Sequence, residues 1–293
     1  MKVGFVGVGK MGLPMASRLL QQNVEVLAFD RSADALAQFC DAGGVAAPDP
    51  AAIADVAEIV FLSLPTPDIM ASTVEAMVGG TALRIVVDLS TSGPTASRAA
   101  AGVLATNGKH LVDCPVSGGV TGARDGSLAM MVAGRPATVA EVMPYLEMIG
   151  RPSVVGEDVG MAQLIKLVNN LISTTALAVT SEALVLAVKA GLDPSTVIDV
   201  LNESSGRTSA SASKIPKHVL NRRFDFGMAV GLSVKDIQLC LAEASRYGVP
   251  MFVGRTVGEI YTATSSQYGP AADMTEIIKT MEAWTGVEVG TVE

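Results

Sequence analysis

Two hydrophobic patterns divide the chain at about residue 158. Before that point, short apolar runs rich in β-branched residues alternate with amphipathic stretches, which predicts strands separated by helices. The expected strands are KVGFVG (2–7), EVLAFD (25–30), EIVFLSL (58–64), RIVVDLS (84–90), HLVDC (110–114), LAMMVAG (128–134) and SVVG (153–156). The expected helices cover residues 10–22, 32–42, 67–79, 94–107 and 136–149. Repeated β-α-β units predict a mostly parallel, doubly wound sheet.

After residue 158 the pattern is helical to the end of the chain. Its longest uninterrupted stretch, residues 160 to 190, would form a helix of about 45 Å. We therefore expect an α/β protein of two domains. Residues 1–158 should form a doubly wound α/β domain, and residues 159–293 an all-helical domain, with a long interdomain helix joining them.

Composition narrows the possible partners. The net charge of −8 argues against a general binder of phosphate backbones, so nucleic acid is not an expected partner. Three widely spaced cysteines and an N-terminus without a signal-peptide pattern fit a cytoplasmic protein. The apolar stretch 171–192 is long enough for a membrane span, but Glu182 at its centre makes lipid burial costly, so no membrane association is expected.

A glycine-rich turn follows the first expected strand. The sequence GFVGVGKMG contains Gly7-x-Gly9-x-x-Gly12, with Lys10 and Met11 inside the same turn. At this place in the first βα unit the pattern is typical of dinucleotide binding: Gly7 allows the tight turn, Gly9 the approach of pyrophosphate, and Gly12 close packing of helix on strand. The helix N-terminus would then face the phosphates.

An acidic residue ends the second expected strand, 18 positions after the last glycine of that turn. Asp30 can accept hydrogen bonds from the adenosine ribose of NAD and would repel the extra phosphate of NADP. Arg31, the next residue, can pair with that phosphate and recover part of the loss. We therefore expect NAD to be preferred, with NADP possible.

Two further stretches carry polar residues that a core does not need. DCPVSGGVTGARDG (113–126) holds Ser117 beside Gly118 and Gly119, a turn that offers backbone N–H groups and a hydroxyl to a carboxylate. In VGMAQLIKLVNN (159–170), Lys166 and Asn170 lie four residues apart and share a helix face. That lysine is either a snorkelling surface residue or a buried ammonium placed for proton transfer.

Four motifs in this order resemble the β-hydroxyacid dehydrogenases, a family that includes 3-hydroxyisobutyrate dehydrogenase, tartronate semialdehyde reductase and, more distantly, 6-phosphogluconate dehydrogenase. They are GVGKMGLPMA, DCPVSGGVTGARDGSL, GMAQLIKLVNN and VKDIQLCLAEA, and the resemblance runs from residue 1 to about residue 285. The one departure is Ala162 where the family usually has a second glycine before the lysine.

The resemblance implies that residues 1–158 form a Rossmann-type dinucleotide-binding domain and residues 159–293 an all-helical domain for substrate binding and oligomerisation. It also implies a role for each motif. It identifies Lys166 as the catalytic lysine, Asn170 as a substrate-binding residue, and Ser117, Gly118 and Gly119 as the receptor of the substrate carboxylate. Lys235 is similar to the lysine that contacts both cofactor and substrate, and Leu64, Pro65 and Thr91 match positions along the cofactor. A lysine titrates near 10.4 in water, so a catalytic base at neutral pH needs burial or a neighbouring cation.

The family resemblance implies an NAD(P)-dependent dehydrogenase for a small β-hydroxy acid or its semialdehyde, similar to 3-hydroxyisobutyrate dehydrogenase. A tartronate semialdehyde or glyoxylate-type reductase, a threonate-type dehydrogenase, an imine reductase and a non-catalytic scaffold of the same fold stay open. No metal is expected, because His110 and His218 lack ligand spacing. A homodimer or homotetramer is expected from the apolar helices after residue 159.

Overall fold

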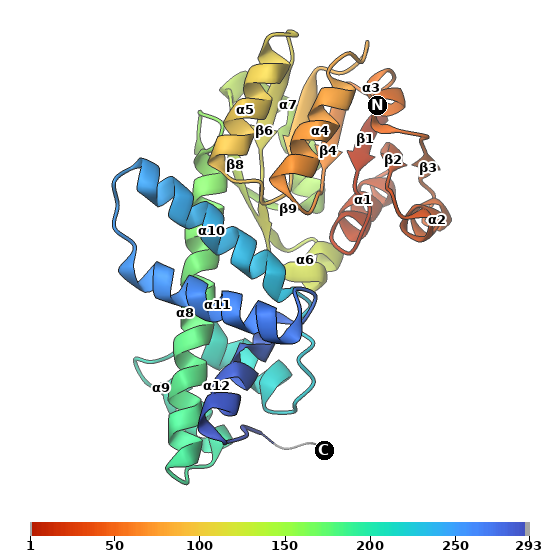
Figure 1. Cartoon of the computed structure of the whole chain (residues 1–293). Helices are drawn as coiled ribbons and strands as arrows, with labels where there is room; N and C mark the ends of the chain where they lie inside the picture. The colour runs from red at the N-terminus through yellow and green to blue at the C-terminus, as the bar shows by residue number, and fades with distance from the viewer. Residues whose placement is uncertain (1, 291–293) are drawn as a thin grey trace. The chain divides into compact units, whose positions relative to one another are not determined.

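The computed structural model describes residues 2–290 and separates into two compact units, Met1–Lys166 and Leu167–Glu293. Figure 1 shows a sheet with its helices in the first unit and helices alone in the second. The predicted fold class, a Rossmann-like parallel sheet followed by a helical C-terminal region, is confirmed.

The N-terminal unit is built on one sheet. Its strands are β1 (Lys2–Val6), β2 (Glu25–Phe29), β3 (Val45–Ala46), β4 (Ile59–Leu62), β5 (Ile85–Asp88), β6 (His110–Asp113), β7 (Val116–Ser117), β8 (Leu128–Ala133) and β9 (Gly150–Gly156). They run in the order β3-β2-β1-β4-β5-β6-β8-β7, with β9 also paired to β8. The strands β1 to β6 pair in parallel, whereas β8 is antiparallel to β6 and β7.

The strand order reverses between β1 and β4. From β1 the chain first builds outward to β2 and β3, and it then returns to place β4 on the other side of β1. In doubly wound sheets, ligands bind beyond the carboxyl ends of the strands at such a reversal. The carboxyl ends of β1 and β4 therefore mark the functional edge of this sheet, which is the place where a ligand is expected to bind.

Helices cover both faces of the sheet, which explains why β4 and β5 are buried at every position. One face packs on α1 (Gly12–Gln21), α2 (Ala33–Asp41), α6 (Gly119–Asp125) and α7 (Pro136–Ile149). The other face packs on α3 (Pro50–Ala54), α4 (Pro67–Met77) and α5 (Pro94–Ala105) (Figure 1).

Local sequence signals set the starts of these helices. The side chains of Ser32, Asp49 and Thr66 accept a hydrogen bond from a backbone N–H in the first turns of α2, α3 and α4. Proline opens α3, α4, α5 and α7, where its missing N–H has no intrahelical partner to lose.

The C-terminal unit is helical. Its elements are α8 (Met161–Lys189), which starts in the N-terminal unit, α9 (Pro194–Glu203), the π-helix η1 (Ala210–Val219), α10 (Val230–Arg246), α11 (Phe252–Tyr268), the 3₁₀ turn η2 (Met274–Glu276) and α12 (Ile277–Thr285). Leu171, Leu177 and Leu184 of α8 enter its core together with Ile237 of α10 and Tyr261 of α11. The helices α10 and α11 lie side by side (Figure 1).

The long helix α8 has 29 residues and a mean hydropathy of 1.8 in its most apolar part, so by length and composition alone it is able to cross a membrane. The same values are met by core helices of soluble proteins. In this protein α8 contributes leucines to the core of the C-terminal unit, and Glu182 in its C-terminal third is exposed.

Candidate functional site

The glycine-rich turn joins β1 to α1 at the functional edge. Gly7 has a φ of +92°, and its N–H donates to the carbonyl of Phe29 at the end of β2. A Cβ on Gly12 would lie 1.8 Å from the carbonyl oxygen of Gly7, so α1 approaches the turn as closely as backbone allows. Met11, the N-cap of α1, supplies no capping side chain, which leaves N–H groups of the first turn for a ligand.

The carboxylate of Asp30 is oriented by two backbone donors. Val8 N–H donates to Oδ2 and Ser32 N–H donates to Oδ1, each over 2.8 Å. A carboxylate has about four acceptor positions, so half of them remain for the hydroxyls of a ribose. The structure therefore ties Asp30 to the glycine-rich turn, 22 residues earlier in the chain.

A cavity of about 820 Å³ opens at this place. Gly9, Lys10 and Asp30 line it, together with Val120 and Arg124 of α6. Apart from Gly9 and its two chain neighbours, no described residue has an atom within 4 Å of the position a Cβ on Gly9 would take, so the backbone there is open to close approach by a ligand. These features fit a dinucleotide with its pyrophosphate at Gly9. Arg31 is exposed and does not line this cavity.

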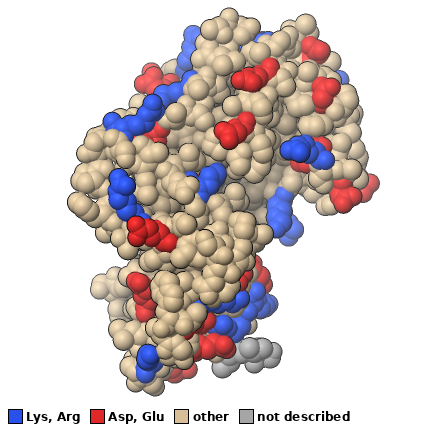
Figure 2. Space-filling view, in the orientation of Figure 1, with Lys and Arg blue, Asp and Glu red and all other residues tan. Residues whose placement is uncertain are grey.

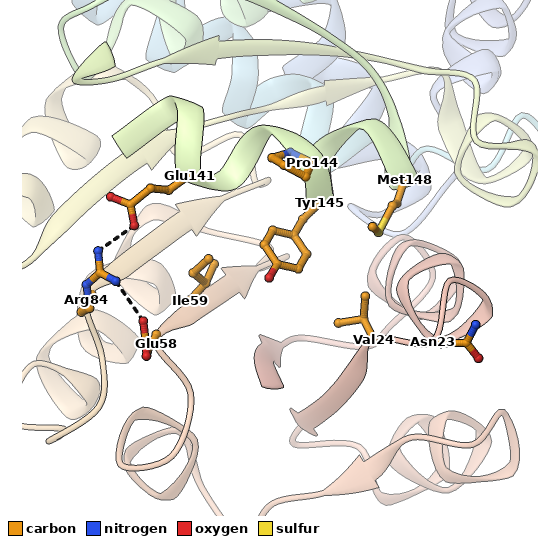
Figure 3. Close-up of a pocket in the computed structure, with 9 residues that line it drawn as sticks. All are labelled: Asn23, Val24, Glu58, Ile59, Arg84, Glu141, Pro144, Tyr145 and Met148. Atoms are coloured by element: carbon orange, nitrogen blue, oxygen red, sulfur yellow. Dashed lines mark hydrogen bonds and ion pairs between the residues drawn. The ribbon is translucent and has the colours of Figure 1, made fainter. Parts of the chain in front are cut away.

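A second cavity, of about 390 Å³, lies at the opposite edge of the same sheet (Figure 3). Val24, Ile59 and Arg84, which line it, stand at or just before the starts of β2, β4 and β5. Figure 3 shows Arg84 between Glu58 and Glu141, with N–O distances of 2.9 and 2.6 Å. The charges of this cavity are thus already paired, and it faces away from the carboxyl ends of the strands.

The loops after β4 and β5 complete the expected cofactor edge. Leu64 N–H donates to the hydroxyl of Ser90 over 2.8 Å, which joins the Leu64-Pro65 segment to the loop that carries Thr91. The structure thus places Leu64 beside the loop of Thr91; the family resemblance assigns both residues, with Pro65, to the cofactor.

The Ser117 turn combines a short strand with a helix N-terminus. Ser117 ends β7, Gly118 has a φ of +137° and caps α6, and Gly119, with a φ of +63°, starts that helix. Both backbone conformations favour glycine. The hydroxyl of Ser117 and the first N–H groups of α6 therefore belong to one glycine-rich turn.

Lys166 is only 7% exposed, on the second turn of α8. The start of this helix is fixed by Asp113, whose Oδ2 accepts the N–H groups of Gly160 and Gln163 over 3.1 Å each. Burial is the main cause that raises the pKa of Asp113 to about 6; the two N–H groups oppose that rise, and the nearby charge of Asp88 adds to it. The side chain of Lys166 is thus carried on a helix with a fixed origin.

Gln163, one turn before Lys166, joins α8 to the loop after β5. Its Oε1 accepts the N–H groups of Ser92 and Gly93, and its Nε2 donates to the carbonyl of Ser90, all over 3.0 Å. Gln163 is fully buried, so these bonds are shielded from water. The loop that carries Thr91 is therefore held by the same helical turn that precedes the lysine.

In the C-terminal unit, Asn170 and Lys235 meet at one carboxylate. Asn170 Nδ2 donates to Asp236 Oδ2 over 2.7 Å, and the ammonium of Lys235 lies 3.1 Å from Asp236 Oδ1. Asp236 is 4% exposed and Lys235 20% exposed. Asp236 therefore fixes the amide orientation of Asn170, whose Oδ1 accepts a hydrogen bond from the amide of Asn169 over 3.2 Å and whose Nδ2 keeps a second N–H to donate.

Sequence reasoning assigned no role to Asp113 or Gln163, and it named Asp236 only beside Lys235 in the matching motif. All three lie in the motifs that carry the family resemblance, so the motifs were the available signal. The hydrogen-bond partners of Asp113 and Gln163 lie 47 to 73 residues away in the sequence, and Asn170 lies 66 residues from Asp236. Local sequence patterns do not detect pairs so far apart.

The described residues hold no candidate metal cluster, and the face drawn in Figure 2 carries no extended basic patch. Among residues 2–290 there is no group of three His, Cys, Asp or Glu side chains suited to a metal ion. In Figure 2, lysine and arginine side chains lie singly or in small groups among neutral and acidic residues.

Comparisons with protein-family models cover nearly the whole chain. Residues 2–163 match the model described as the NAD binding domain of 6-phosphogluconate dehydrogenase. Residues 160–281 match the model described as NAD-binding of NADP-dependent 3-hydroxyisobutyrate dehydrogenase.

Individual proteins agree with these models. A 2-(hydroxymethyl)glutarate dehydrogenase of Eubacterium barkeri is 36% identical over 98% of this chain and 97% of its own. A 3-hydroxyisobutyrate dehydrogenase of Pseudomonas aeruginosa is 35% identical over 83% of this chain and 85% of its own. The solved structure of Mycobacterium tuberculosis 3-hydroxyisobutyrate dehydrogenase with L-serine superposes with a TM-score of 0.87 at 26% identity, covering 96% and 98% of the two chains.

Proposed function

Because the chain belongs to the β-hydroxyacid dehydrogenase family, we propose that it oxidises a small β-hydroxy acid to the semialdehyde, or catalyses the reverse reduction, with NAD preferred and NADP accepted. The observation that carries the proposal is the buried Lys166, one helical turn before Asn170 on α8. The bound nicotinamide supplies the hydride acceptor or donor.

Lys166 provides the proton transfer in this proposal. During oxidation its neutral amine removes the proton of the substrate hydroxyl, and during reduction its ammonium protonates the carbonyl oxygen as hydride arrives. Burial to 7% exposure favours this use, because bulk water has little access to the amine. Lys166 lies one helical turn after Gln163, so the bonds of Gln163 to the loop after β5 fix the position of the lysine backbone.

The carboxylate and the reacting hydroxyl are held by separate groups. Ser117, Gly118 and Gly119 bind the carboxylate through the hydroxyl and the N–H groups at the start of α6. Asn170, oriented by Asp236, donates the second N–H of its amide to the oxygen of the substrate hydroxyl, whose proton is directed at Lys166. Lys235, paired with Asp236, is the cation that the family resemblance assigns to cofactor and substrate. Fixing both ends of a short substrate limits the poses of its reacting carbon.

The substrate class follows from what the relatives' names share. In both 3-hydroxyisobutyrate and 2-(hydroxymethyl)glutarate, a hydroxymethyl group and a carboxylate are attached to one carbon. The two compounds differ only in the third substituent of that carbon. We propose that this enzyme acts on acids of the form HOCH₂–CH(R)–COO⁻, in the cytoplasm and as a homo-oligomer.

An initial-rate survey tests this function. The purified protein is given NAD or NADP with 3-hydroxyisobutyrate, 2-(hydroxymethyl)glutarate, glycerate, threonate and 3-hydroxypropionate, and, in the reductive direction, NADH or NADPH with tartronate semialdehyde, glyoxylate and cyclic imines. Turnover of at least one 2-(hydroxymethyl) acid supports the proposal. Reduction of imines without turnover of any hydroxy acid or semialdehyde makes the protein an imine reductase, and turnover of none of these compounds leaves a non-catalytic scaffold.

A further inference from the structure

A second buried lysine lies in the C-terminal unit, outside the groups assigned above. Lys214, in the middle of η1, is 5% exposed. Its Nζ donates to the hydroxyl of Ser173 over 2.9 Å and to the hydroxyl of Ser209 over 3.1 Å. It also lies 5.5 Å from the ring centre of Phe226.

The partners of this ammonium are neutral. No ion pair involves Lys214 in the described part of the chain, and burial lowers its pKa, as expected for a cation surrounded by hydroxyls and an aromatic ring. Each hydroxyl that accepts from Nζ keeps its own O–H to donate, and an ammonium has three N–H donors. The cluster therefore offers hydrogen-bond donors and a positive charge that has no ion-pair partner among the described residues.

The winding of η1 explains how the cluster forms. In a π-helix, residues five apart are one turn apart, and Ser209 and Lys214 have this separation. Pro216 lies inside the same helix and has no N–H to donate, which is tolerated poorly by an ordinary α-helix. Ser209 is exposed, so the cluster opens toward solvent on that side. Inserted π-helical turns are frequent at functional sites.

The second hydroxyl places this cluster beside a residue already assigned to the substrate. Ser173 lies three residues after Asn170 on α8, so the two side chains share a helix face, about 4.5 Å apart along the helix axis. Thr174 is buried and bonds back to the carbonyl of Asn170, so it does not compete for this face. The ammonium of Lys214 thus marks the next turn of that face beyond Asn170.

We propose that Lys214, Ser173 and Ser209 form a subsite for a second, distal carboxylate of the substrate. This inference rests on the proposed function and narrows it to 2-(hydroxymethyl) dicarboxylic acids, in which the substituent R ends in a carboxylate. A two-methylene substituent places its carboxyl carbon three C–C bonds from the branching carbon, a reach of roughly 4 Å that matches the axial step from Asn170 to Ser173.

A matched set of three acids tests the subsite. 2-(Hydroxymethyl)glutarate carries the distal carboxylate, 2-(hydroxymethyl)pentanoate replaces that carboxylate by a methyl group, and 3-hydroxyisobutyrate replaces the whole substituent by a methyl group. We expect the wild type to have the highest kcat/KM for the diacid. Lys214→Met keeps a side chain of similar length without the charge. Its kcat/KM for the diacid should be 10- to 100-fold below that of the wild type, the scale of a charge-assisted hydrogen bond, whereas its kcat/KM for the pentanoate should change little.

The controls separate a binding role from a structural one. Lys217→Met removes an exposed lysine from the same helix and should leave all three values unchanged. Lys214→Arg keeps the charge and should retain part of the preference for the diacid. A wild type that shows no preference for the diacid overturns the subsite. The subsite is also overturned if Lys214→Met lowers kcat/KM equally for all three acids, because an equal loss indicates a damaged fold and not a lost contact with the distal carboxylate.

A binding experiment makes the outcome independent of turnover. Glutarate, which has no hydroxyl to oxidise, is titrated by calorimetry into the NAD-loaded enzyme. Binding that weakens at least 10-fold in Lys214→Met and stays unchanged in Lys217→Met supports the subsite, even if no hydroxy acid is oxidised and the proposed dehydrogenase activity fails. Equal binding in wild type and Lys214→Met, with hydroxy acids still oxidised, overturns the subsite and leaves the dehydrogenase intact.

Discussion

Asp113 should make the stability of the protein depend on pH in an unusual direction. Its carboxylate is fully buried, Oδ2 accepts two N–H groups at the start of α8, and no partner for Oδ1 is present among the described residues. Burial, with the charge of Asp88, raises its pKa from 3.8 to about 6. The folded protein therefore binds a proton between about pH 4 and pH 6 that the unfolded chain releases.

The sign and size follow from this difference. A raised pKa stabilises the folded state fully below 3.8, and this stabilisation is lost as the pH rises through 6. Over the whole titration the effect amounts to about 3 kcal/mol, of which about 1 kcal/mol lies between pH 7 and pH 5. Asp113→Asn keeps an oxygen for the two N–H groups and removes the titrating proton.

The measurement is the free energy of unfolding in urea at pH 5, 6, 7 and 8 for the wild type and Asp113→Asn. The difference between them, wild type minus variant, should rise by about 1 kcal/mol from pH 7 to pH 5. Circular dichroism is the suitable probe, because the single tryptophan, Trp284, lies in the C-terminal unit and Asp113 in the other. Asp41→Asn, at an exposed position of α2, serves as the matched control.

A difference that stays constant with pH, or that falls as the pH is lowered, would refute the reasoning. The first result would show that Asp113 ionises in the folded protein as it does in the unfolded chain. The second would show that the two N–H groups of α8 outweigh the cost of burying the charge.

Two further predictions concern the cofactor and the assembly. Asp30→Ala should reduce kcat/KM with NAD relative to NADP by about tenfold, or about 1.4 kcal/mol, because the carboxylate held by Val8 and Ser32 would bind the ribose. A wild type that clearly prefers NADPH would show this assignment to be wrong. Light scattering at micromolar concentration should give at least twice the 30.1 kDa chain mass, because α8 exposes an apolar row, Ile172, Val179 and Leu186, at seven-residue spacing and 55 to 71% exposure. A monomer, or an oligomer unaffected by Leu186→Lys, would contradict this.

The sequence predicted the main elements of the fold well, because the signals that define them are local. β1, β2, β6 and β8 begin at the predicted residues, and α7 has the predicted limits. The short elements β3, β7, α3 and α6 were not predicted. They have two to seven residues, too few for a period to show, and β7 and α6 lie in the glycine-rich segment that was interpreted only as a turn.

The predicted site residues came from motifs, and the groups that support them came from the structure. A motif identifies Lys166 and Asn170, but the bonds from Asp113 and Gln163 that fix the start of α8 connect distant parts of the chain. Lys214 had no sequence signal, because its burial depends on the winding of η1 and on Ser173, 41 residues away. A run of serines before a lysine is ordinarily a solvated loop.

The most direct test of the account is the turnover of Lys166→Ala with the 2-(hydroxymethyl) acid that the wild type oxidises fastest. Removing a positioned acid/base should lower kcat by a factor on the order of 10² to 10⁴, while the affinity for NADH, measured by the fluorescence of the bound cofactor, stays roughly unchanged. Lys189→Ala, an exposed lysine at the other end of α8, should retain full activity. Near-normal turnover in Lys166→Ala would contradict the assignment of proton transfer to this lysine.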